Sequence, residues 1–547
     1  MASILTHSGF RFRAFHSFDQ IIWPASAYSL LTMDDDFQYS SLTMNSRDRS
    51  RQLESKFPRS SEFSRQHVAA VSFAGRLGLA LTLTAAISGC RVGPNYHAPS
   101  VQLQPFHNAP SIEARTDAPP APSLDQWWVG FQDPKLTEVV QRSLAENLDL
   151  AAALTRVQQA RAVAKGAGAA RLPAGSLSAS TTSLRQSLES PFGRISPVIP
   201  GYQRDQNYYD LGISASWETD LFGSLRRGAE AATAEAQAAE AMRTGTRISI
   251  AAEAADAYLQ IRGAQARLSF AHEQIETDQH LVDLVRQRKD AGVASDRELA
   301  QAEALLSGAK ATIPLLDTVL ESELNRLDVL MGAQPGTYAA DLKVVADIPV
   351  VPSIPNTAAP MDLLRRRPDI IAAEREVAAS NARIGQSLAE YYPKLSLSGI
   401  VGSEALAPAH LFEQQGFQSI GVAGLRWRLF DFGRVDAEVK QARGANAEAL
   451  LRYRSSVLHA AEDVEDAFTL LAQSENRRSE LLLEIAQLQR VRDRSQESYN
   501  AGVIGLTDVL DADRQLLAAK DELAVSREGA ARAAVGSFRA LGGGWQP

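Results

Sequence analysis

The single cysteine of this 547-residue chain, Cys90, ends a pattern that can direct covalent lipid attachment. An apolar run over residues 77–87 precedes it, with Arg76 before the run and small residues between the run and the cysteine. A secretory signal peptide typically has a basic region, then an apolar region too short to span a bilayer, then small residues before a cleavage point. We therefore predict a lipoprotein signal peptide over 66–89 and transfer of a diacylglyceryl group to the Cys90 thiol after cleavage. The alternative is an unmodified cysteine behind an ordinary signal peptide, since a lone cysteine cannot form an intrachain disulfide.

Residues 1–65 show no lasting apolar period, and no structure or function is predicted for them. Because a signal peptide normally begins close to the start of a precursor, this extension is interpreted as the result of a start codon assigned too far upstream. The whole chain has 56 basic and 64 acidic side chains and a net charge of −8. This acidic balance does not favour a nucleic-acid partner.

Other motifs with possible chemistry have simpler interpretations. The triplet Asp431-Phe432-Gly433 matches the metal-binding triplet of protein kinases, but no Gly-rich loop or catalytic-loop motif accompanies it. Its place just after a predicted strand favours a hinge between strand and helix. The nine histidines lack metal-ligand spacing, and there is no nucleophile elbow. We therefore predict no enzyme active site, no cofactor and no metal, and we interpret the charged cluster at 365–369 as a solvated helix boundary.

The chain contains an internal repeat, which appears when the sequence is compared with itself. Residues 144–178 match 364–398 at an offset of 220, and residues 217–332 match 427–542 at an offset of 210. The ten additional residues of the first copy fall in a Pro- and Gly-containing stretch typical of a loop. Two copies of one unit, each of about two hundred residues, therefore follow each other.

Each copy is predicted to contain one very long helix followed by a tight turn and a returning helix. No proline occurs in 224–290 or 434–500, and apolar residues recur there near the heptad spacing. A helix of 67 residues is roughly 100 Å long, which no ordinary globular domain contains. Gly292 and Gly502 stand where a helix needs a left-handed C-terminal residue, so both are predicted to form the turns at the helix tips.

Each copy also contains two predicted strands before its long helix. Tyr209, Leu211, Ile213, Ala215 and Trp217 alternate with polar residues, so one face of this strand is apolar. Its length of about ten residues suffices to cross a bilayer when tilted. In the last strand Ile420 and Val422 fall out of phase with Leu425, and the sequence leaves open whether a bulge or a second apolar face explains this.

Four strands in one chain require assembly, because an open sheet edge in lipid leaves backbone groups unpaired at a cost of several kcal/mol each. Strands from several chains must then join to form one closed sheet. The sequence therefore predicts an α+β membrane protein rather than a scaffold made only of coiled coils.

The chain resembles the TolC-like outer-membrane efflux proteins, and within them the lipoprotein branch often called NodT-like or OprM-like. The resemblance covers the whole chain after Cys90 and rests on several signatures, which lie at 90–96, 127–128, 133–136, 147–150, 392–395, 429–433 and 499–502. It implies a homotrimer with a 12-stranded transmembrane β-barrel, four strands per chain, continued by a long α-helical barrel in the periplasm. It also implies a periplasmic adaptor (membrane fusion) protein, an inner-membrane pump of the resistance-nodulation-division type and outer-membrane lipid as partners.

The same resemblance assigns the pore constriction to the second helix tip. Asp508 and Asp511 match the acidic pair of TolC, and their spacing of three places them on one helix face. Threefold repetition would create carboxylate rings that favour cations; the alternative is a pair of ordinary solvated aspartates. Tyr499 and Ile504 belong to the same tip. Ile504 replaces an arginine of the TolC closing network, which implies closure by apolar contact rather than by a salt bridge.

Seven segments follow from these observations: an extension without assigned structure (1–65), the signal peptide (66–89), a lipid-anchored segment (90–132), the first repeat (133–332), an equatorial linker (333–359), the second repeat (360–542) and a short tail (543–547). The resemblance implies an outer-membrane duct for small molecules, lipid-anchored and extending into the periplasm. The alternative function is the outer-membrane duct of a type I protein secretion system.

Overall fold

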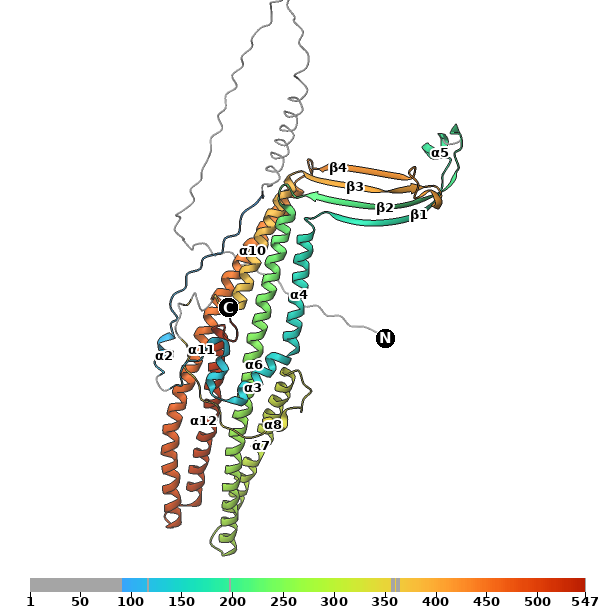
Figure 1. Cartoon of the computed structure of the whole chain (residues 1–547). Coiled ribbons are helices and arrows are strands. Elements are labelled where there is room, and N and C mark those ends of the chain that lie inside the picture. Colours follow the sequence, from blue (N-terminus) through green and yellow to red (C-terminus); the bar gives the residue numbers. More distant parts are fainter. Residues whose placement is uncertain (1–90, 116–117, 196–197, 356–359, 361–364, 547) are drawn as a thin grey trace, which may run out of the picture. The chain divides into compact units, whose positions relative to one another are not determined.

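The computed structural model describes residues 91–546 except 116–117, 196–197, 356–359 and 361–364. All of these residues belong to one compact unit, Gly78–Pro547. Figure 1 shows its elements, which are in chain order α2 (Ala109–Glu113), η1 (Leu124–Phe131), α3 (Pro134–Glu146), α4 (Leu148–Ala169), β1 (Ala174–Arg185), α5 (Pro191–Ile195), β2 (Asp205–Thr219), α6 (Ser224–Asp290), α7 (Asp296–Leu330), α8 (Ala339–Leu342), α10 (Pro368–Leu388), η3 (Ala389–Tyr391), β3 (Lys394–Ala405), η4 (Pro408–His410), β4 (Phe417–Arg426), α11 (Arg434–Asn500) and α12 (Leu506–Ala540).

The predicted order of elements within each half of the chain is confirmed. The first half reads α4, β1, β2, α6, α7, and the second reads α10, β3, β4, α11, α12. The lengths agree pairwise, because α6 and α11 each have 67 residues and α7 and α12 each have 35. Both long helices begin after a glycine with left-handed φ, Gly223 at 82° and Gly433 at 86°. The triplet that ends in Gly433 therefore lies between β4 and α11, as predicted.

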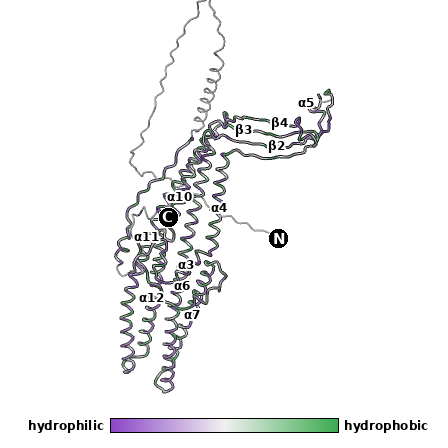
Figure 2. The backbone as a smooth tube through the Cα atoms, viewed as in Figure 1, coloured by the Kyte–Doolittle hydropathy of each residue, from purple (hydrophilic) through white to green (hydrophobic). Residues whose placement is uncertain are grey.

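The long helices pack as two antiparallel hairpins, α6 with α7 and α11 with α12 (Figure 1). Helix α4 packs against α6, and α10 packs against both α6 and α11. Figure 2 shows hydrophobic and hydrophilic residues interspersed along these helices. Among the described residues, no helix is both long enough and apolar enough to cross a membrane.

The largest apolar core lies where η1 and α3 meet α6 and α12. Trp127 of η1 is 1% exposed and stacks on Phe538 of α12, with ring centroids 5.4 Å apart and an interplanar angle of 8°. Phe131 meets both rings edge-on. This aromatic cluster fixes the N-terminal segment against the last helix, roughly halfway along the long helices.

The four strands form one antiparallel sheet in the order β1-β2-β3-β4. The register between β3 and β4 runs without interruption from Lys394 opposite Arg426 to Ser403 opposite Phe417. A bulge therefore does not explain the irregular pattern of β4. Ile420 instead pairs with Ile400, so β3 and β4 carry apolar side chains on both faces.

The charged cluster before α10 is only partly solvated, which corrects one sequence-based interpretation. The helix begins at Pro368 as expected for a boundary, but the Arg367 side chain is only 12% exposed. Its guanidinium donates to the carbonyl of Ala540, at the end of α12, at 3.2 Å and to the carboxylate of Asp463 at 2.7 Å. Arg367 therefore joins three helices, a contact between residues 173 positions apart that local sequence does not reveal.

Candidate functional site

Gly292 and Gly502 lie in the turns that end the two long helices. Both have φ of 72°, in the left-handed region. The N–H of Val293 donates to the carbonyl of Arg288 at 2.8 Å, and the N–H of Val503 donates to that of Ser498 at 2.9 Å. These are the bonds of a Schellman motif, which closes a helix C-terminus. A Cβ at either glycine would meet nothing within 4 Å, so backbone conformation alone selects glycine there.

The returning helices begin with matching caps. Ser295 and Glu298 form a capping box at α7, in which Glu298 accepts from the Ser295 N–H at 2.6 Å. This bond to the backbone lowers the pKa of Glu298 below its ordinary value. At α12 the corresponding acid is Asp508, whose carboxylate accepts from the Gly505 N–H at 3.1 Å. Asp508 therefore also has a local role as a helix cap.

Both members of the predicted acidic pair are exposed. Asp511 lies one turn beyond Asp508 and accepts from the Arg514 guanidinium at 2.6 Å and from Gln515 at 2.7 Å. Within one chain, one carboxylate thus caps a helix and the other pairs with a neighbouring cation. Exposed pairs of this kind contribute little to stability, about 0–1 kcal/mol.

Tyr499 connects the two hairpins at their tips. It is half-buried, its hydroxyl accepts from the Arg288 guanidinium, and the guanidinium carbon lies 4.9 Å from the centroid of its ring. Ile504 is half-buried in the adjacent turn. Arg288 was not predicted from the sequence, because it lies 211 residues before Tyr499 and belongs to no recognised motif. The tip therefore combines an apolar residue at 504 with a cation from the other hairpin.

A groove of about 680 Å³ lies above these caps, between α6, α7 and α12. Asp511 and Arg514 are among its lining residues, and Asp278 of α6, 3% exposed, also lines it. Burial raises the pKa of Asp278, a side-chain hydrogen bond with Gln274 partly opposes this, and the nearby carboxylate of Asp513 adds to the rise. No ion pair of the described residues includes Asp278. The interface between the two hairpins thus contains a carboxylate without a paired cation.

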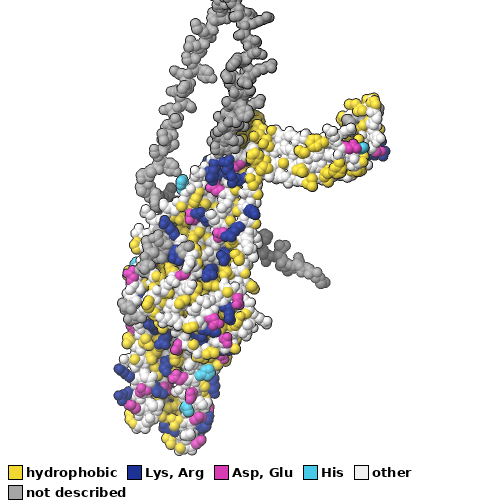
Figure 3. All heavy atoms as spheres, in the orientation of Figure 1, with side chains coloured by type: hydrophobic (Ala, Val, Ile, Leu, Met, Phe, Trp, Pro, Cys, Tyr) yellow, Lys and Arg dark blue, Asp and Glu magenta, His cyan; other side chains and the backbone are white. Residues whose placement is uncertain are grey.

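The sheet has one face that is apolar along its middle. The register places Ile213 of β2 between Leu177 of β1 and Val401 of β3. These side chains are 61%, 72% and 55% exposed in the single chain. No charged residue occurs in 174–184, 211–217, 395–403 or 417–425, which form a band across all four strands. Figure 3 shows mainly hydrophobic and uncharged side chains along the middle of the sheet, whereas charged side chains are common on the helices.

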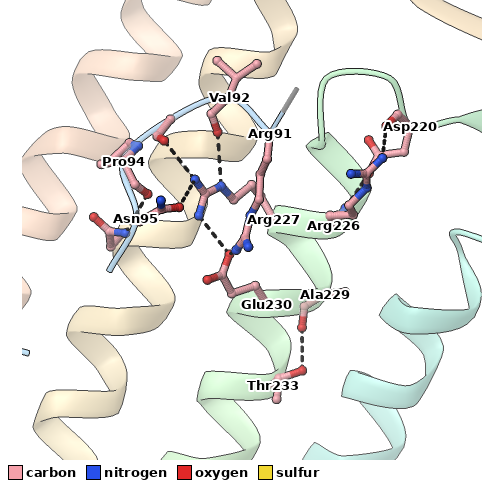
Figure 4. A network of polar contacts seen from close by, with 12 residues as sticks. Arg91, Val92, Pro94, Asn95, Asp220, Arg226, Arg227, Ala229, Glu230 and Thr233 are labelled. Atoms are coloured by element: carbon pink, nitrogen blue, oxygen red, sulfur yellow. Dashed lines mark hydrogen bonds and ion pairs between the residues drawn. The ribbon is translucent and has the colours of Figure 1, made fainter. Parts of the chain in front are cut away.

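The N-terminal residues that follow Cys90 are held by a buried arginine at the start of α6 (Figure 4). The Arg227 side chain is fully buried, and its guanidinium donates to the carbonyls of Val92 and Gly93 at 3.1 and 2.9 Å. It also donates to Asn95 at 3.2 Å and to Glu230 at 3.0 Å. The carboxylate of Glu230 accepts a second hydrogen bond from Arg91.

Helix α10 leaves the space that this arginine occupies. A Cβ at Gly385 would lie 2.6 Å from Arg227 Nε and 2.9 Å from the carbonyl oxygen of Val92. The N–H of Val92 in turn donates to the carbonyl of Phe222 at 3.2 Å, in the short link between β2 and α6. The segment after Cys90 is therefore fixed at the junction between strands and helices. Cys90 itself lies outside the described residues.

The comparisons with known proteins agree with this geometry. The family of outer membrane efflux proteins matches the chain twice, over residues 139–333 and 359–543. The chain belongs to the outer membrane efflux protein family. This outer membrane efflux protein is 33% identical over 430 residues to the pyoverdine export outer membrane protein OpmQ of Pseudomonas aeruginosa, which covers 78% of this chain and 89% of the relative.

Two further similarities place this efflux protein within the family. Nodulation protein T of Rhizobium leguminosarum is 28% identical over 474 residues, covering 85% of this chain and 93% of the relative. The solved structure of the outer-membrane channel OprN superimposes with a TM-score of 0.76 at 32% identity, covering 84% of this chain and 100% of that chain. The predicted resemblance to the NodT-like and OprM-like branch is confirmed, and this protein is an outer-membrane channel of efflux systems with the TolC-like fold.

Proposed function

We propose that three copies of this chain form one duct, with a 12-stranded barrel in the outer membrane and a helical tube in the periplasm. The observation that carries this proposal is the sheet. Its edge strands β1 and β4 each pair with one described strand, so the outer edge of each has no partner among the described strands, and unpaired edges are not tolerated in lipid. Residues 395–403 of its uncharged band span about 30 Å at 3.3 Å per residue, which at a strand tilt of about 35–45° is a rise of roughly 23 Å, close to the apolar band of about 25 Å in outer-membrane barrels.

We further propose that the chain is built from two repeats, 133–332 and 360–542, joined by the linker 333–359. The pairwise equal lengths of α6 and α11 and of α7 and α12 support this. The two matches to the family, over 139–333 and 359–543, support it as well.

The cargo that fits best is a small molecule delivered by an inner-membrane pump through a periplasmic adaptor. Relatives of this chain are named for export of pyoverdine and efflux of toluene, both small molecules. A pump of the resistance-nodulation-division type is the expected partner. Accumulation of a fluorescent pump substrate in cells with and without this chain tests the proposal. Equal accumulation in both strains, with the adaptor and pump present, would contradict it.

Cys90 is proposed to be the lipidated N-terminus of the mature chain. The docking of residues 91–95 at the strand–helix junction supports this, because it fixes the segment next to the proposed membrane surface. Intact-mass and peptide mass spectrometry of protein isolated from outer membranes is expected to find an acylated cysteine at position 90. A mature N-terminus elsewhere, or an unmodified Cys90, would show that the anchor is absent.

Asp508 and Asp511 are proposed to set ion preference at the periplasmic entrance. Both are exposed on adjacent turns of α12, and three copies bring six carboxylates around one axis. The double variant Asp508→Asn, Asp511→Asn removes this charge yet keeps a side-chain oxygen to cap α12. Planar-bilayer recording is expected to show reduced cation selectivity, while the amount of trimer stays the same. Glu462→Gln, an exposed acid 38 residues before the end of α11, serves as the control.

Unchanged selectivity in a trimeric double variant would place the constriction elsewhere at the tip. The nearest alternatives are Ile504 and Tyr499, which lie in or beside the same turn.

A further inference from the structure

A second hollow lies beside the aromatic cluster, where the C-terminal tail meets η1 and α6. Its volume is about 580 Å³, in the range of pockets that hold small molecules. Asp125 and Trp128 of η1, Arg247 of α6, and Trp545 and Gln546 of the tail line it, together with uncharged residues of α3. We call this hollow the tail pocket. It contains none of the residues of the helix tips or of the sheet.

The path of the tail into this pocket is fixed by three consecutive glycines. Gly542 and Gly544 have φ of 72° and 108°, values that glycine adopts without strain. The N–H of Gly544 donates to the carbonyl of Leu124 at 2.7 Å. A Cβ at Gly543 would lie 3.0 Å from the same carbonyl oxygen, so the tail passes close against η1. This close approach brings Trp545 to the pocket.

Two indole N–H groups of the tail pocket lack an acceptor. Trp128 is 2% exposed, and its Nε1 has no hydrogen-bond partner among the described residues. The Nε1 of Trp545 is also buried and finds no partner in the described part of the chain. An indole N–H can only donate, and buried donors in proteins are nearly always paired. The acceptor must therefore come from water or from a bound molecule.

Arg247 adds a positive charge to the same pocket, which favours an anion over water. Its Nε donates to the carbonyl of Gly544 at 3.0 Å, and within the described ranges it forms no ion pair. Burial, and then the neighbouring guanidinium of Arg243, lower the pKa of Arg247. A guanidinium presents a planar set of donors that fits a carboxylate. The pocket thus combines three donor groups and an uncompensated cation.

The internal repeat shows that the fold does not require a cation at this position. The residue 210 positions after Arg247 is Val457 of α11, which is 1% exposed and belongs to the apolar core. The tail has no equivalent either, because the residue 210 positions before Trp545 is Pro335. Burial of a charge is unfavourable unless a partner compensates it. Arg247 and Trp545 are therefore features of this pocket and not of the repeated architecture.

Asp125 is the only acid among the described residues that line the pocket. Its carboxylate accepts from Gln546 Nε2 at 3.0 Å. Hydrogen bonds from Ser123 and Gln546, and the charge of Arg366, lower the pKa of Asp125. Arg366 lies close by, because its guanidinium donates to the carbonyl of Trp545 at 3.3 Å. The carboxylate is therefore ionised and can accept one more hydrogen bond, from an N–H or O–H of a ligand.

We propose that the tail pocket binds a small carboxylic acid that also carries an N–H or O–H donor, such as the free C-terminus of a short peptide. The ligand carboxylate accepts from Arg247 and from the indoles of Trp128 and Trp545, and the ligand donor binds Asp125. A cationic ligand would leave the guanidinium and both indoles without acceptors. The site is separate from the tips and the sheet, so this inference goes beyond the proposed duct and does not depend on it.

Three probes test the chemistry of the ligand. Isothermal titration calorimetry on the purified full-length protein in detergent compares N-acetyl-alanyl-alanine, its C-terminal amide and inorganic phosphate. The acid is expected to bind at least about tenfold more tightly than the amide, because only the acid forms charge-assisted hydrogen bonds. Equal affinity for acid and amide would overturn the proposal. Phosphate that binds as tightly as the acid would show a general anion site and would overturn the proposed ligand class.

Variants of the pocket test its location. Arg247→Gln is expected to weaken binding of the acid about tenfold or more, and Arg247→Lys, which keeps the charge, is expected to weaken it less. Trp545→Phe keeps an aromatic ring but removes the N–H, and a severalfold loss is expected. Arg452→Gln, an exposed arginine on α11, is the control and is expected to bind as the wild type does.

The melting temperature of each variant shows whether it is folded. Trp545→Phe keeps the test decisive if Arg247→Gln is unstable, because it leaves the bond between Arg247 and Gly544 in place. If the folded variants bind the acid with wild-type affinity, the tail pocket is not its site and the proposal is wrong. The proposed duct is unaffected by either result, because no step of transport enters the measurement.

Discussion

Replacement of Ile213 by arginine is expected to prevent the protein from assembling in the outer membrane. Ile213 lies near the middle of the uncharged band, between Leu177 and Val401 on the apolar face of the sheet. An arginine on the lipid face near the bilayer midplane costs about 2–4 kcal/mol per chain. Because each of the three copies would contain this arginine, the trimer is expected to be lost from outer-membrane fractions.

The neighbouring variant Ser214→Arg is the matched control. Ser214 points to the opposite face of the same strand, where its hydroxyl lies 2.8 Å from that of Ser176. An arginine there faces the interior of the proposed barrel, where polar side chains are ordinary. The measurement is the fraction of protein that runs as a trimer on gels of unheated outer membranes. If both arginine variants assemble equally well, the assignment of the two faces is wrong.

The second large effect is expected from Arg227→Met. Loss of the guanidinium leaves the carbonyls of Val92 and Gly93 without their donor and removes a partner of Glu230. Leaving a buried acceptor without its hydrogen bond costs about 1–3 kcal/mol, whereas Glu230, 34% exposed, keeps Arg91 as a partner. We expect a lower melting temperature and release of residues 91–95 from the start of α6.

Trypsin measures this release directly, because it cleaves after Arg91. The rate of cleavage between Arg91 and Val92, followed by mass spectrometry, is expected to rise in Arg227→Met and in Gly385→Leu, which fills the space of the guanidinium. Arg243→Met, an exposed arginine on the same helix, is expected to leave both cleavage and melting unchanged. Wild-type cleavage and melting in Arg227→Met would mean that the N-terminal segment is held by other contacts.

Local features of the structure were predictable from sequence where a single residue type decides a local conformation. The ends of α6 and α11 follow from Gly292 and Gly502, since few other residues adopt a left-handed φ without strain. The cap of α7 follows from the spacing of Ser295 and Glu298. The faces of β2 follow from strict alternation around Ile213.

Features that depend on distant contacts were not predictable in this way. In the sequence Arg227 is one of several charged residues near the start of a predicted helix. Its role depends on the fold, which places residues 91–95 and Gly385 in contact with it. Arg288 meets Tyr499 for the same reason. The pattern of β4 left two explanations open, and the register with β3 decided between them by pairing Ile420 with Ile400. Periodicity reports how a segment alternates but not which strand lies beside it.

The most direct test of this account is a single-particle structure of the full-length protein in lipid nanodiscs. The account predicts three copies around one axis and twelve strands in one closed barrel, with β4 of each copy hydrogen-bonded to β1 of the next. Ile213 would face lipid, and the helices would continue the barrel as one tube. A different number of copies, or a sheet that closes within one chain, would contradict it.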